Sequence, residues 1–236
     1  MQLPLFFEEN LPMPGKFIMS EESSKHIVQV LRMQEAQQLL ITNGKGEVLT
    51  ASLVAANKKN AEVAITGLTF IPQPKPKITV GISLVKNANR FEWFLEKATE
   101  IGVSEIIPFI SGRTEKQHFR HDRMKKIVIS AMLQSQQAWL PLLHEPVKFA
   151  ELIKRYSCEN KYIAHCIEED QKRELADETW QPGDQLILIG PEGDFTKNET
   201  EAALENNYIP VGLGKTRLRT ETAAIVAAVL LLNRKV

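Results

Sequence analysis

Residues 188–195 read Leu-Ile-Gly-Pro-Glu-Gly-Asp-Phe, and residues 213–223 read Leu-Gly-Lys-Thr-Arg-Leu-Arg-Thr-Glu-Thr-Ala. Each stretch follows an apolar run that is typical of a buried strand, and each leads into a helical pattern. Two glycine turns at the ends of neighbouring strands usually form one ligand pocket between them. The pair therefore predicts an α/β fold with a ligand site between the two turns.

Strand-like and helix-like patterns alternate from residue 78 onward. Apolar runs predict strands at 78–85, 105–110, 161–167, 185–190 and 208–212. Helices are predicted at 90–101, 120–139, 196–206 and 220–233, the first capped by Asn89 and the third by a capping box of Thr196 and Glu199. This alternation predicts a parallel sheet with helices on both faces. The last helix is apolar on nearly every side, which favours burial against both the sheet and a second subunit.

The first 70 residues have the pattern of a small β domain. Asn43-Gly44-Lys45-Gly46 separates two apolar strands and predicts a hairpin. A further strand is predicted at 62–66 and one helix at 23–33, a combination that favours a small barrel acting as a binding module. Alternate prolines predict a stiff linker at 71–77. We therefore expect domains at 1–70 and 78–236.

The composition is that of a globular protein without a membrane span. Of the 236 residues 43% are hydrophobic, and no apolar run approaches the roughly 20 residues needed to cross a bilayer. The N-terminus lacks a basic start and carries Glu8 and Glu9, so it does not resemble a secretion signal. Cys158 and Cys166 have no metal-ligand pattern around them and are interpreted as reduced thiols of a cytoplasmic protein.

The charge is balanced overall but unevenly distributed. There are 29 basic and 29 acidic residues, and a net charge of zero neither suggests nor excludes a nucleic-acid partner. Basic residues nevertheless dominate 112–126 and 207–236, whereas 151–206 is acidic. A single cluster of this kind is usually a solvated helix face. Two clusters, one of them on a turn beside the predicted site, make a phosphate-bearing partner about as probable as not.

Two nucleotide-binding motifs fail when their positions are counted. Gly214-Lys215-Thr216 resembles the end of a P-loop, but Ile209 stands where that motif needs a glycine. Gly212-Leu213-Gly214 resembles the start of a dinucleotide fingerprint, but Arg217 stands at the third glycine. No serine lies in a nucleophile elbow, and the five histidines show no metal-ligand spacing. We therefore expect no metal and a reactive group that is supplied by a bound cofactor.

Two features of the turns are each open to two interpretations. Residues 190–193 either let the backbone approach a ligand closely or only form a tight turn. Arg217 and Arg219 lie at a helix start, where an arginine can bind a phosphate or a carboxylate bidentately. Alternatively, these arginines form ion pairs with Glu221 or with the acidic segment 151–206.

Together, the two turns and Leu218-Arg219-Thr220-Glu221-Thr222-Ala223 resemble the bacterial 16S ribosomal RNA uridine N3-methyltransferases, a family of the knotted SPOUT class. The resemblance covers roughly residues 1 to 225. Each motif alone is weak, but the ordered set is highly specific. The other matching segments are Lys97-Ala98-Thr99-Glu100-Ile101-Gly102-Val103, Lys86, Arg90, Pro108, Arg113, and His26 with Val30-Leu31-Arg32.

The resemblance implies an N-terminal PUA-like β-barrel followed by a SPOUT methyltransferase domain with a trefoil knot, a rare exception to unthreaded chains. It also implies a homodimer that binds S-adenosyl-L-methionine at the knot loops, and a uridine of 16S ribosomal RNA in the small subunit as substrate. The implied cofactor-binding residues are Ile189, Gly190, Pro191, Glu192, Gly193, Leu213, Gly214, Leu218, Arg219 and Thr220, with a weaker contact near His165. The expected RNA-binding residues are Arg32, Lys86, Arg90 and Arg113.

For the chemistry, we expect the target base to leave its stack and Arg219 to stabilise the negative charge on its oxygens, with Glu221 orienting Arg219. No residue stands out as a general base. The chain departs from the family pattern at Asp194, where a second glycine is usual, and around Leu133 and Gln137, where a glutamate and an arginine are usual. An RNA-binding or assembly module without catalysis, or methylation of another RNA or of a protein, remains an alternative.

Overall fold

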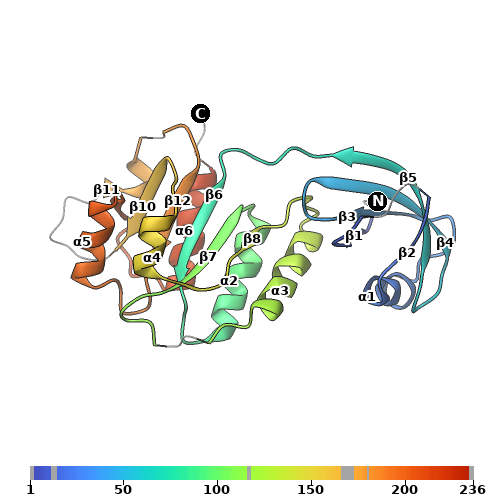
Figure 1. Ribbon diagram of the computed structural model, residues 1–236, viewed down its shortest axis with the longest axis horizontal. Helices are drawn as coiled ribbons and strands as arrows, with labels where there is room; N and C mark the ends of the chain where they lie inside the picture. Colours follow the sequence, from blue (N-terminus) through green and yellow to red (C-terminus); the bar gives the residue numbers. More distant parts are fainter. Residues whose placement is uncertain (1–2, 12–14, 116–117, 166–172, 180, 234–236) are drawn as a thin grey trace. The chain divides into compact units, whose positions relative to one another are not determined.

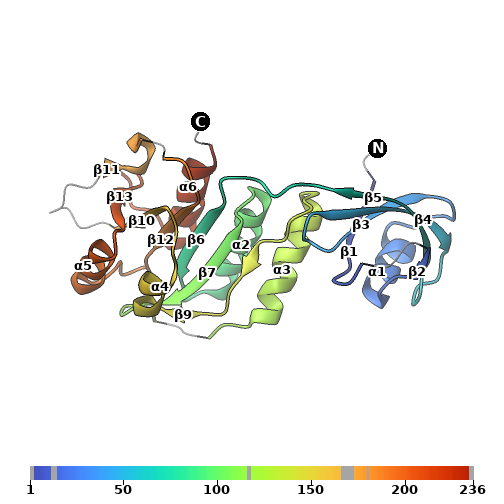
Figure 2. The same ribbon diagram turned by 45° about the horizontal axis from the view of Figure 1, so that its top comes forward.

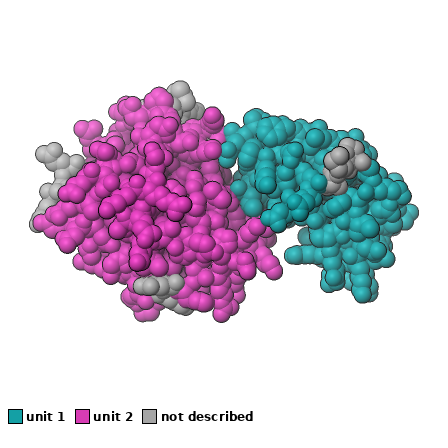
Figure 3. All heavy atoms as spheres, viewed as in Figure 1, with its two compact units in different colours: residues 1–73, 132–140 teal, residues 74–131, 141–236 magenta. Residues whose placement is uncertain are grey.

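The computed structural model describes residues 3–11, 15–115, 118–165, 173–179 and 181–233. The chain divides into two compact units, residues 1–73 with 132–140 and residues 74–131 with 141–236 (Figure 3). Cys166, the end of the strand expected at 161–167, and parts of both basic segments lie outside the described residues. Within the described residues, no helix is both long and apolar enough to cross a bilayer.

The first unit is built on a five-stranded sheet with the order β1-β3-β4-β5-β2. Its strands are β1 (Leu5–Phe7), β2 (Lys16–Ile18), β3 (Gln38–Thr42), β4 (Glu47–Ala55) and β5 (Glu62–Phe70). β1 runs parallel to β3, and the other pairs are antiparallel. Leu49, Ala51 and Leu53 of β4 alternate into one apolar core. The hairpin and the strand at 62–66 are confirmed, whereas β1 and β2 are too short for a periodic pattern to reveal them.

The hairpin loop between β3 and β4 packs against residues that are distant in the sequence. Gly44 and Gly46 have φ values of 69° and 88°. A Cβ atom on Gly44 would lie 2.7 Å from Leu140, and one on Gly46 would lie 2.6 Å from Trp139. Leu140 N–H also donates to Gly44 O at 2.8 Å. Residues 132–140 therefore complete the first unit, which the expected division of the chain at its linker did not include.

The helix expected at 23–33 is confirmed only in part. It consists of α1 (Glu21–Lys25) and a π-helical turn, η1 (His26–Val30). Arg32 follows with a φ of 51°, in the left-handed region, and so the helix ends before Met33.

The second unit contains an eight-stranded sheet in which every pairing is parallel (Figures 1 and 2). The strand order is β11-β13-β10-β12-β6-β7-β8, and β9 also pairs with β7. The strands are β6 (Ile78–Ser83), β7 (Glu105–Ile110), β8 (Leu142–Leu143), β9 (Val147–Lys148), β10 (Asn160–Ala164), β11 (Arg173–Glu174), β12 (Gln185–Ile189) and β13 (Ile209–Gly212). β6 and β12 are buried at every position, as in a sheet covered on both faces. The α/β class is confirmed, and the trefoil knot stays a prediction of the resemblance.

Helices cover both faces of this parallel sheet. α2 packs on α6, and α4 packs on α5. Figure 1 shows α4 in front of the strands and α6 behind them. The helices are α2 (Ala88–Glu100), α3 (His121–Gln134), α4 (Phe149–Arg155), α5 (Lys197–Glu205) and α6 (Thr220–Leu232), and a short 3-10 turn, η2, spans Leu175–Asp177.

Two helix ends differ from the expectations. Asn87, not Asn89, caps α2, because the Asn87 side chain accepts the Asn89 N–H at 3.0 Å. α3 ends at Gln134 rather than near residue 139, because Gln136 adopts a left-handed φ of 57°.

Candidate functional site

Three neighbouring strands of the parallel sheet end level with one another. β10 lies between β12 and β13, and Ala164 at its end pairs with Ile189 on one side and Val211 on the other. Because parallel strands share one carboxyl edge, the turns after β12 and β13 leave the sheet on either side of His165. The two glycine turns and the weaker contact expected near His165 are thus brought together.

The first turn, residues 190–195, is a tight reversal. Asp194 N–H donates to Pro191 O at 2.9 Å. Asp194 has a left-handed φ of 62°, and its Oδ1 accepts the N–H of Phe195 at 2.8 Å. A Cβ atom on Gly190 would lie 3.1 Å from the Phe195 ring, so the backbone there needs glycine. Phe195 is buried against two other rings of the core, those of Phe109 and Phe149.

The loop after β7 holds the first turn through backbone contacts. Arg113 Nη1 donates to Gly193 O at 2.6 Å. Gly112 N–H donates to Glu199 Oε1 at 2.7 Å, and the other oxygen of this carboxylate accepts Thr196 N–H in the capping box of α5. Arg113, expected to bind RNA, therefore lies on the first turn, and the predicted capping box is confirmed.

Lys86, which follows β6, lies in the electric field of the first turn. Its Nζ is 2.8 Å from Glu115 Oε2. The hydrogen bond and the charge of Glu115 raise the pKa of Lys86, and the charge of Glu192 in the turn raises it further. Lys86 is fully charged at neutral pH, and it is exposed.

The second turn, residues 213–219, is held by a carboxylate that the sequence pattern did not indicate. Glu174 Oε2 accepts Gly214 N–H at 2.7 Å. A Cβ atom on Gly212 would lie 2.7 Å from the other oxygen of Glu174, so close approach requires this glycine. Gly214 has a φ of 104°, so backbone conformation requires this one.

The start of α6 places the two expected catalytic residues in different surroundings. Arg219 is the exposed N-cap, and its side chain makes no capping hydrogen bond. Glu221 is only 5% exposed, and its Oε1 lies 3.7 Å from Nε of Arg90 in α2. Glu221 is thus paired with Arg90 rather than with Arg219, which corrects the expected pairing. Glu221 Oε2 is buried with no hydrogen-bond partner among the described residues.

The ten residues expected to bind the cofactor form a graded surface around the two turns. The buried members are Ile189, Gly190, Pro191 and Thr220. The half-buried members are Leu213 and Leu218, and the exposed members are Glu192, Gly193, Gly214 and Arg219. Half-buried apolar side chains beside backbone N–H and C=O groups suit a nucleoside that needs both apolar contact and hydrogen bonds. The residues present therefore fit a nucleoside-bearing cofactor such as S-adenosylmethionine.

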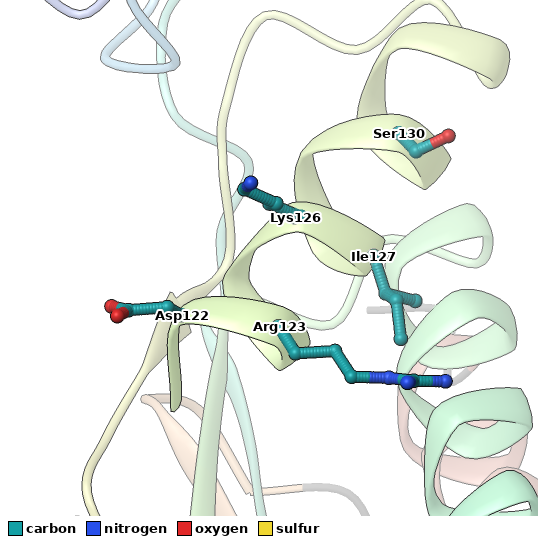
Figure 4. Close-up of a pocket in the computed structure, with 5 residues that line it drawn as sticks. All are labelled: Asp122, Arg123, Lys126, Ile127 and Ser130. Carbon is teal, nitrogen blue, oxygen red and sulfur yellow. The ribbon is translucent and has the colours of Figure 1, made fainter. Parts of the chain in front are cut away.

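A shallow hollow lies elsewhere on the second unit, along α3 (Figure 4). Its lining residues are Asp122, Arg123, Lys126, Ile127 and Ser130. Arg123 extends toward α2, where its Nε lies 2.8 Å from Glu92 Oε1. Because no lining residue belongs to either glycine turn, this hollow is separate from the site that the turns form.

Sequence reasoning missed the two acidic residues that brace the turns. Glu174 lies 40 positions before Gly214, and Glu199 lies 87 positions after Gly112. The acidic character of 151–206 was visible, but composition does not say which carboxylates meet a backbone N–H. For Glu199 the capping box was a signal, although it indicated only the helix start.

Two family comparisons cover most of the chain. Residues 72–232 match the RNA methyltransferase domain, and residues 20–66 match the RNA methyltransferase PUA domain. The chain is also similar to the ribosomal RNA small subunit methyltransferase E of Bacillus subtilis (strain 168), with 28% identity over 224 residues that cover 89% of this chain and 87% of the relative.

Solved structures resemble the whole chain. A probable rRNA-methyltransferase from Porphyromonas gingivalis superposes with a TM-score of 0.89 and 35% identity, covering 96% of this chain and 95% of that one. A ribosomal RNA small subunit methyltransferase E from Neisseria gonorrhoeae, bound to S-adenosyl methionine, superposes with a TM-score of 0.86 and 30% identity, covering 97% and 96%.

Proposed function

Because the chain belongs to the RNA methyltransferase family, we propose that it is an S-adenosylmethionine-dependent enzyme that methylates N3 of a uridine in 16S ribosomal RNA. The observation that carries this proposal is the level ending of β10, β12 and β13, which places both glycine turns beside one another. The similarity to a small-subunit RNA methyltransferase with bound S-adenosyl methionine supports the cofactor and the class of substrate.

The cofactor supplies, when bound, an electrophilic methyl carbon on a positively charged sulfur. In the reaction, uridine N3 loses its proton and forms a bond to the methyl carbon, while the bond between that carbon and sulfur breaks. The chain's own contribution is to hold the reacting groups in line and to exclude water. The backbone of residues 189–193 and the half-buried Leu213 and Leu218 would orient the cofactor.

Arg219 is the residue best placed to act on the uracil. It is exposed at the start of α6, and its guanidinium is not used to cap the helix. Loss of the N3 proton spreads negative charge onto the uracil oxygens, and a guanidinium donates two parallel hydrogen bonds to such a pair of atoms. We therefore assign Arg219 an electrostatic role. Glu221 contributes indirectly, since its pairing with Arg90 fixes the first turn of α6 against α2.

The site of action and the assembly state belong to the same proposal. We expect a cytoplasmic enzyme that acts on the small ribosomal subunit as a homodimer. Support for the dimer comes from α6, which is apolar around its whole circumference yet leaves part of its surface open to solvent. The exposed Arg32 and Lys86 are the side chains that we expect to bind RNA phosphates.

Two measurements test the function. Calorimetry with S-adenosylmethionine should show binding to the purified protein. Mass spectrometry of 16S ribosomal RNA from cells that lack the gene should show one N3-methyluridine missing, and the purified protein should restore it on isolated small subunits. Cofactor binding without restored methylation would favour an RNA-binding module, and retention of the modification in the mutant cells would rule out the assigned reaction.

Arg219→Ala tests the role of the guanidinium. Removing one electrostatic stabiliser of a transition state usually slows the chemical step by about 100- to 1,000-fold. We expect that loss in single-turnover methylation, with cofactor affinity nearly unchanged. Arg217→Ala is the control, because Arg217 is a neighbouring exposed arginine on the same turn. An Arg219→Ala variant with the full single-turnover rate would contradict the assignment.

A further inference from the structure

The π-helical turn η1 of the first unit presents a small apolar and basic surface to solvent. Val30 is 68% exposed and Leu31 is 42% exposed, which is unusual for two adjacent aliphatic side chains. Arg32 follows them and is also exposed. We call residues Val30, Leu31 and Arg32 the knuckle.

The wide turn is what brings Leu31 to the surface. In an α-helix, residues four apart lie on one face, so Leu31 would share the buried face of Ile27. Instead, Leu31 N–H donates to His26 O, five positions back, at 2.9 Å. Met33 N–H then donates to Ile27 O at 3.0 Å, and both of these side chains enter the core. The π-helical turn thus moves the three knuckle residues off the buried face, and such turns are frequent at functional sites.

The backbone of the knuckle is strained at Arg32. Its φ of 51° is the left-handed conformation that usually falls to glycine at a helix end. A side chain in this conformation costs about 1–2 kcal/mol relative to a right-handed one. Strain of this kind at an exposed arginine points toward a role for the side chain itself.

The charges around the knuckle favour an anionic partner. Residues 26–34 contain no aspartate or glutamate. Lys25 is already paired with Glu21 at 2.7 Å, whereas no ion pair of Arg32 occurs within the part of the chain that the structure describes. The guanidinium of Arg32 is therefore available to a phosphate, with two aliphatic side chains beside it.

We propose that the knuckle is a contact surface for an unpaired stretch of RNA, with Arg32 on a phosphate and Val30 and Leu31 against an exposed base. This inference rests on the proposed function, since it takes the substrate to be RNA. Apolar side chains can reach a base face only where the strand is unstacked, because a duplex hides those faces. The knuckle therefore selects single-stranded over duplex RNA.

Arg32→Gly separates the guanidinium from the strain. Glycine should relieve the left-handed backbone and raise the melting temperature by about 1–3 °C. The same change should weaken binding of a fluorescein-labelled oligouridylate of about ten nucleotides by about 5- to 10-fold, and reduce the slope of log affinity against log salt by about 0.7. The full-length protein is used throughout, and binding is read by fluorescence anisotropy.

Ala36→Gly is the matched control. Ala36 is another exposed residue of the same unit with a left-handed φ, 68°, but it has no charge. It should gain the same stability and keep the affinity of the unchanged protein. Unchanged binding in Arg32→Gly, or an equal loss in Ala36→Gly, would overturn the role of Arg32.

The apolar part of the knuckle has its own test. The double substitution Val30→Ser and Leu31→Ser should weaken oligouridylate binding by about 3- to 10-fold without changing the salt slope, and should leave binding to an RNA duplex of equal length unchanged. Leu68→Ser is the control, because Leu68 of β5 is 63% exposed in the same unit. Equal losses for single strand and duplex would overturn the base contact. A loss seen only on assembled subunits would assign the knuckle to a ribosomal protein instead.

These results are independent of methyl transfer. Cofactor affinity, measured by calorimetry, should be the same in every knuckle variant. If the unchanged protein binds RNA through the knuckle but transfers no methyl group, the reaction is wrong and the knuckle stands. If it transfers the methyl group while the knuckle variants bind RNA normally, the opposite holds.

Discussion

Asp194 shows how a single residue can replace the glycine that its turn would usually contain. Its left-handed φ of 62° is tolerated because a short polar side chain can bond to the local backbone, here Phe195 N–H at 2.8 Å. The departure from the family pattern is therefore compatible with the same turn. The first turn keeps its shape with aspartate in place of glycine.

Substitutions at Asp194 should follow backbone preference. Asp194→Gly loses one hydrogen bond and gains freedom from strain, so the free energy of unfolding should change by less than about 1 kcal/mol. Asp194→Val should lose about 2 kcal/mol, because a β-branched side chain tolerates this φ poorly. Urea unfolding measures both, and calorimetry should show reduced cofactor affinity for the valine variant alone. A stable valine variant with normal affinity would contradict this account.

Tyr208 offers a pH-dependent test at the same scale. Its hydroxyl is buried with no hydrogen-bond partner among the described residues, and burial raises the pKa of the phenol well above its usual value near 10. The folded form thus disfavours ionisation, so this contribution to stability is present below about pH 10 and is lost as the pH rises further.

We expect Tyr208→Phe to remove the alkaline decline and to raise stability near pH 7 by about 1–3 kcal/mol, because no unsatisfied hydroxyl remains. Urea unfolding at about pH 7.5 and 10.5 measures both effects. Lys161 lies over the ring at 4.9 Å and keeps that contact in either protein. A variant less stable than the unchanged protein at neutral pH would show that the hydroxyl is satisfied.

At this scale the sequence predicted the glycines but not their partners. Glycine has a local signature, because left-handed backbone and close approach both select it. Glu174 and Glu221 act through contacts with residues far away in sequence, Gly214 and Arg90. Nothing local distinguishes such a carboxylate from the other acidic side chains of the chain. The order of the ten cofactor-binding residues therefore stays a prediction of the resemblance.

Among the elements, α5 links its own start to the loop beside the first turn. One oxygen of Glu199 accepts Thr196 N–H within the capping box, and the other accepts Gly112 N–H. Thr196→Ala should lower the free energy of unfolding by about 1 kcal/mol through loss of the cap. Glu199→Ala should cost about 1 kcal/mol more, because Gly112 also loses its acceptor.

Urea unfolding of both variants checks this difference. Lys197→Ala is the control, because Lys197 is exposed in the first turn of the same helix and should change stability by less than about 0.5 kcal/mol. Equal losses for Thr196→Ala and Glu199→Ala would mean that the contact with Gly112 contributes nothing to stability.

The elements that the sequence predicted well are those with strong periodic or capping signals. The strands at 78–85 and 185–190 and the last helix lie within a few residues of β6, β12 and α6. α3 was expected to be longer, because Gln136 carries no sign of the left-handed backbone that ends it. α4 and the two-residue strands were missed, since short elements depend on tertiary contacts rather than on pattern.

For the whole molecule, the outer side of α6 is the surface that most needs a partner. Ile225, Val229 and Leu232 recur at helical spacing and are not buried within the chain. Val229→Glu should convert a dimer to a monomer, because a charge would be buried in an apolar interface. Analytical ultracentrifugation at micromolar concentration measures the change.

Leu204→Glu on α5 is the control, since Leu204 and Val229 are both 36% exposed. We expect the Leu204 variant to remain dimeric. An unchanged protein that sediments as a monomer, or dissociation in both variants, would contradict a dimer formed through α6.

The return of residues 132–140 to the first unit also sets an order of events during synthesis. Gly44 and Gly46 of the hairpin meet Leu140 and Trp139 only after about 67 further residues have been added beyond the end of the first stretch at Gln73. At about 5–20 residues per second, that delay is about 3–13 s. During translation, the nascent sheet must therefore wait with its hairpin glycines uncovered while much of the second unit is being made.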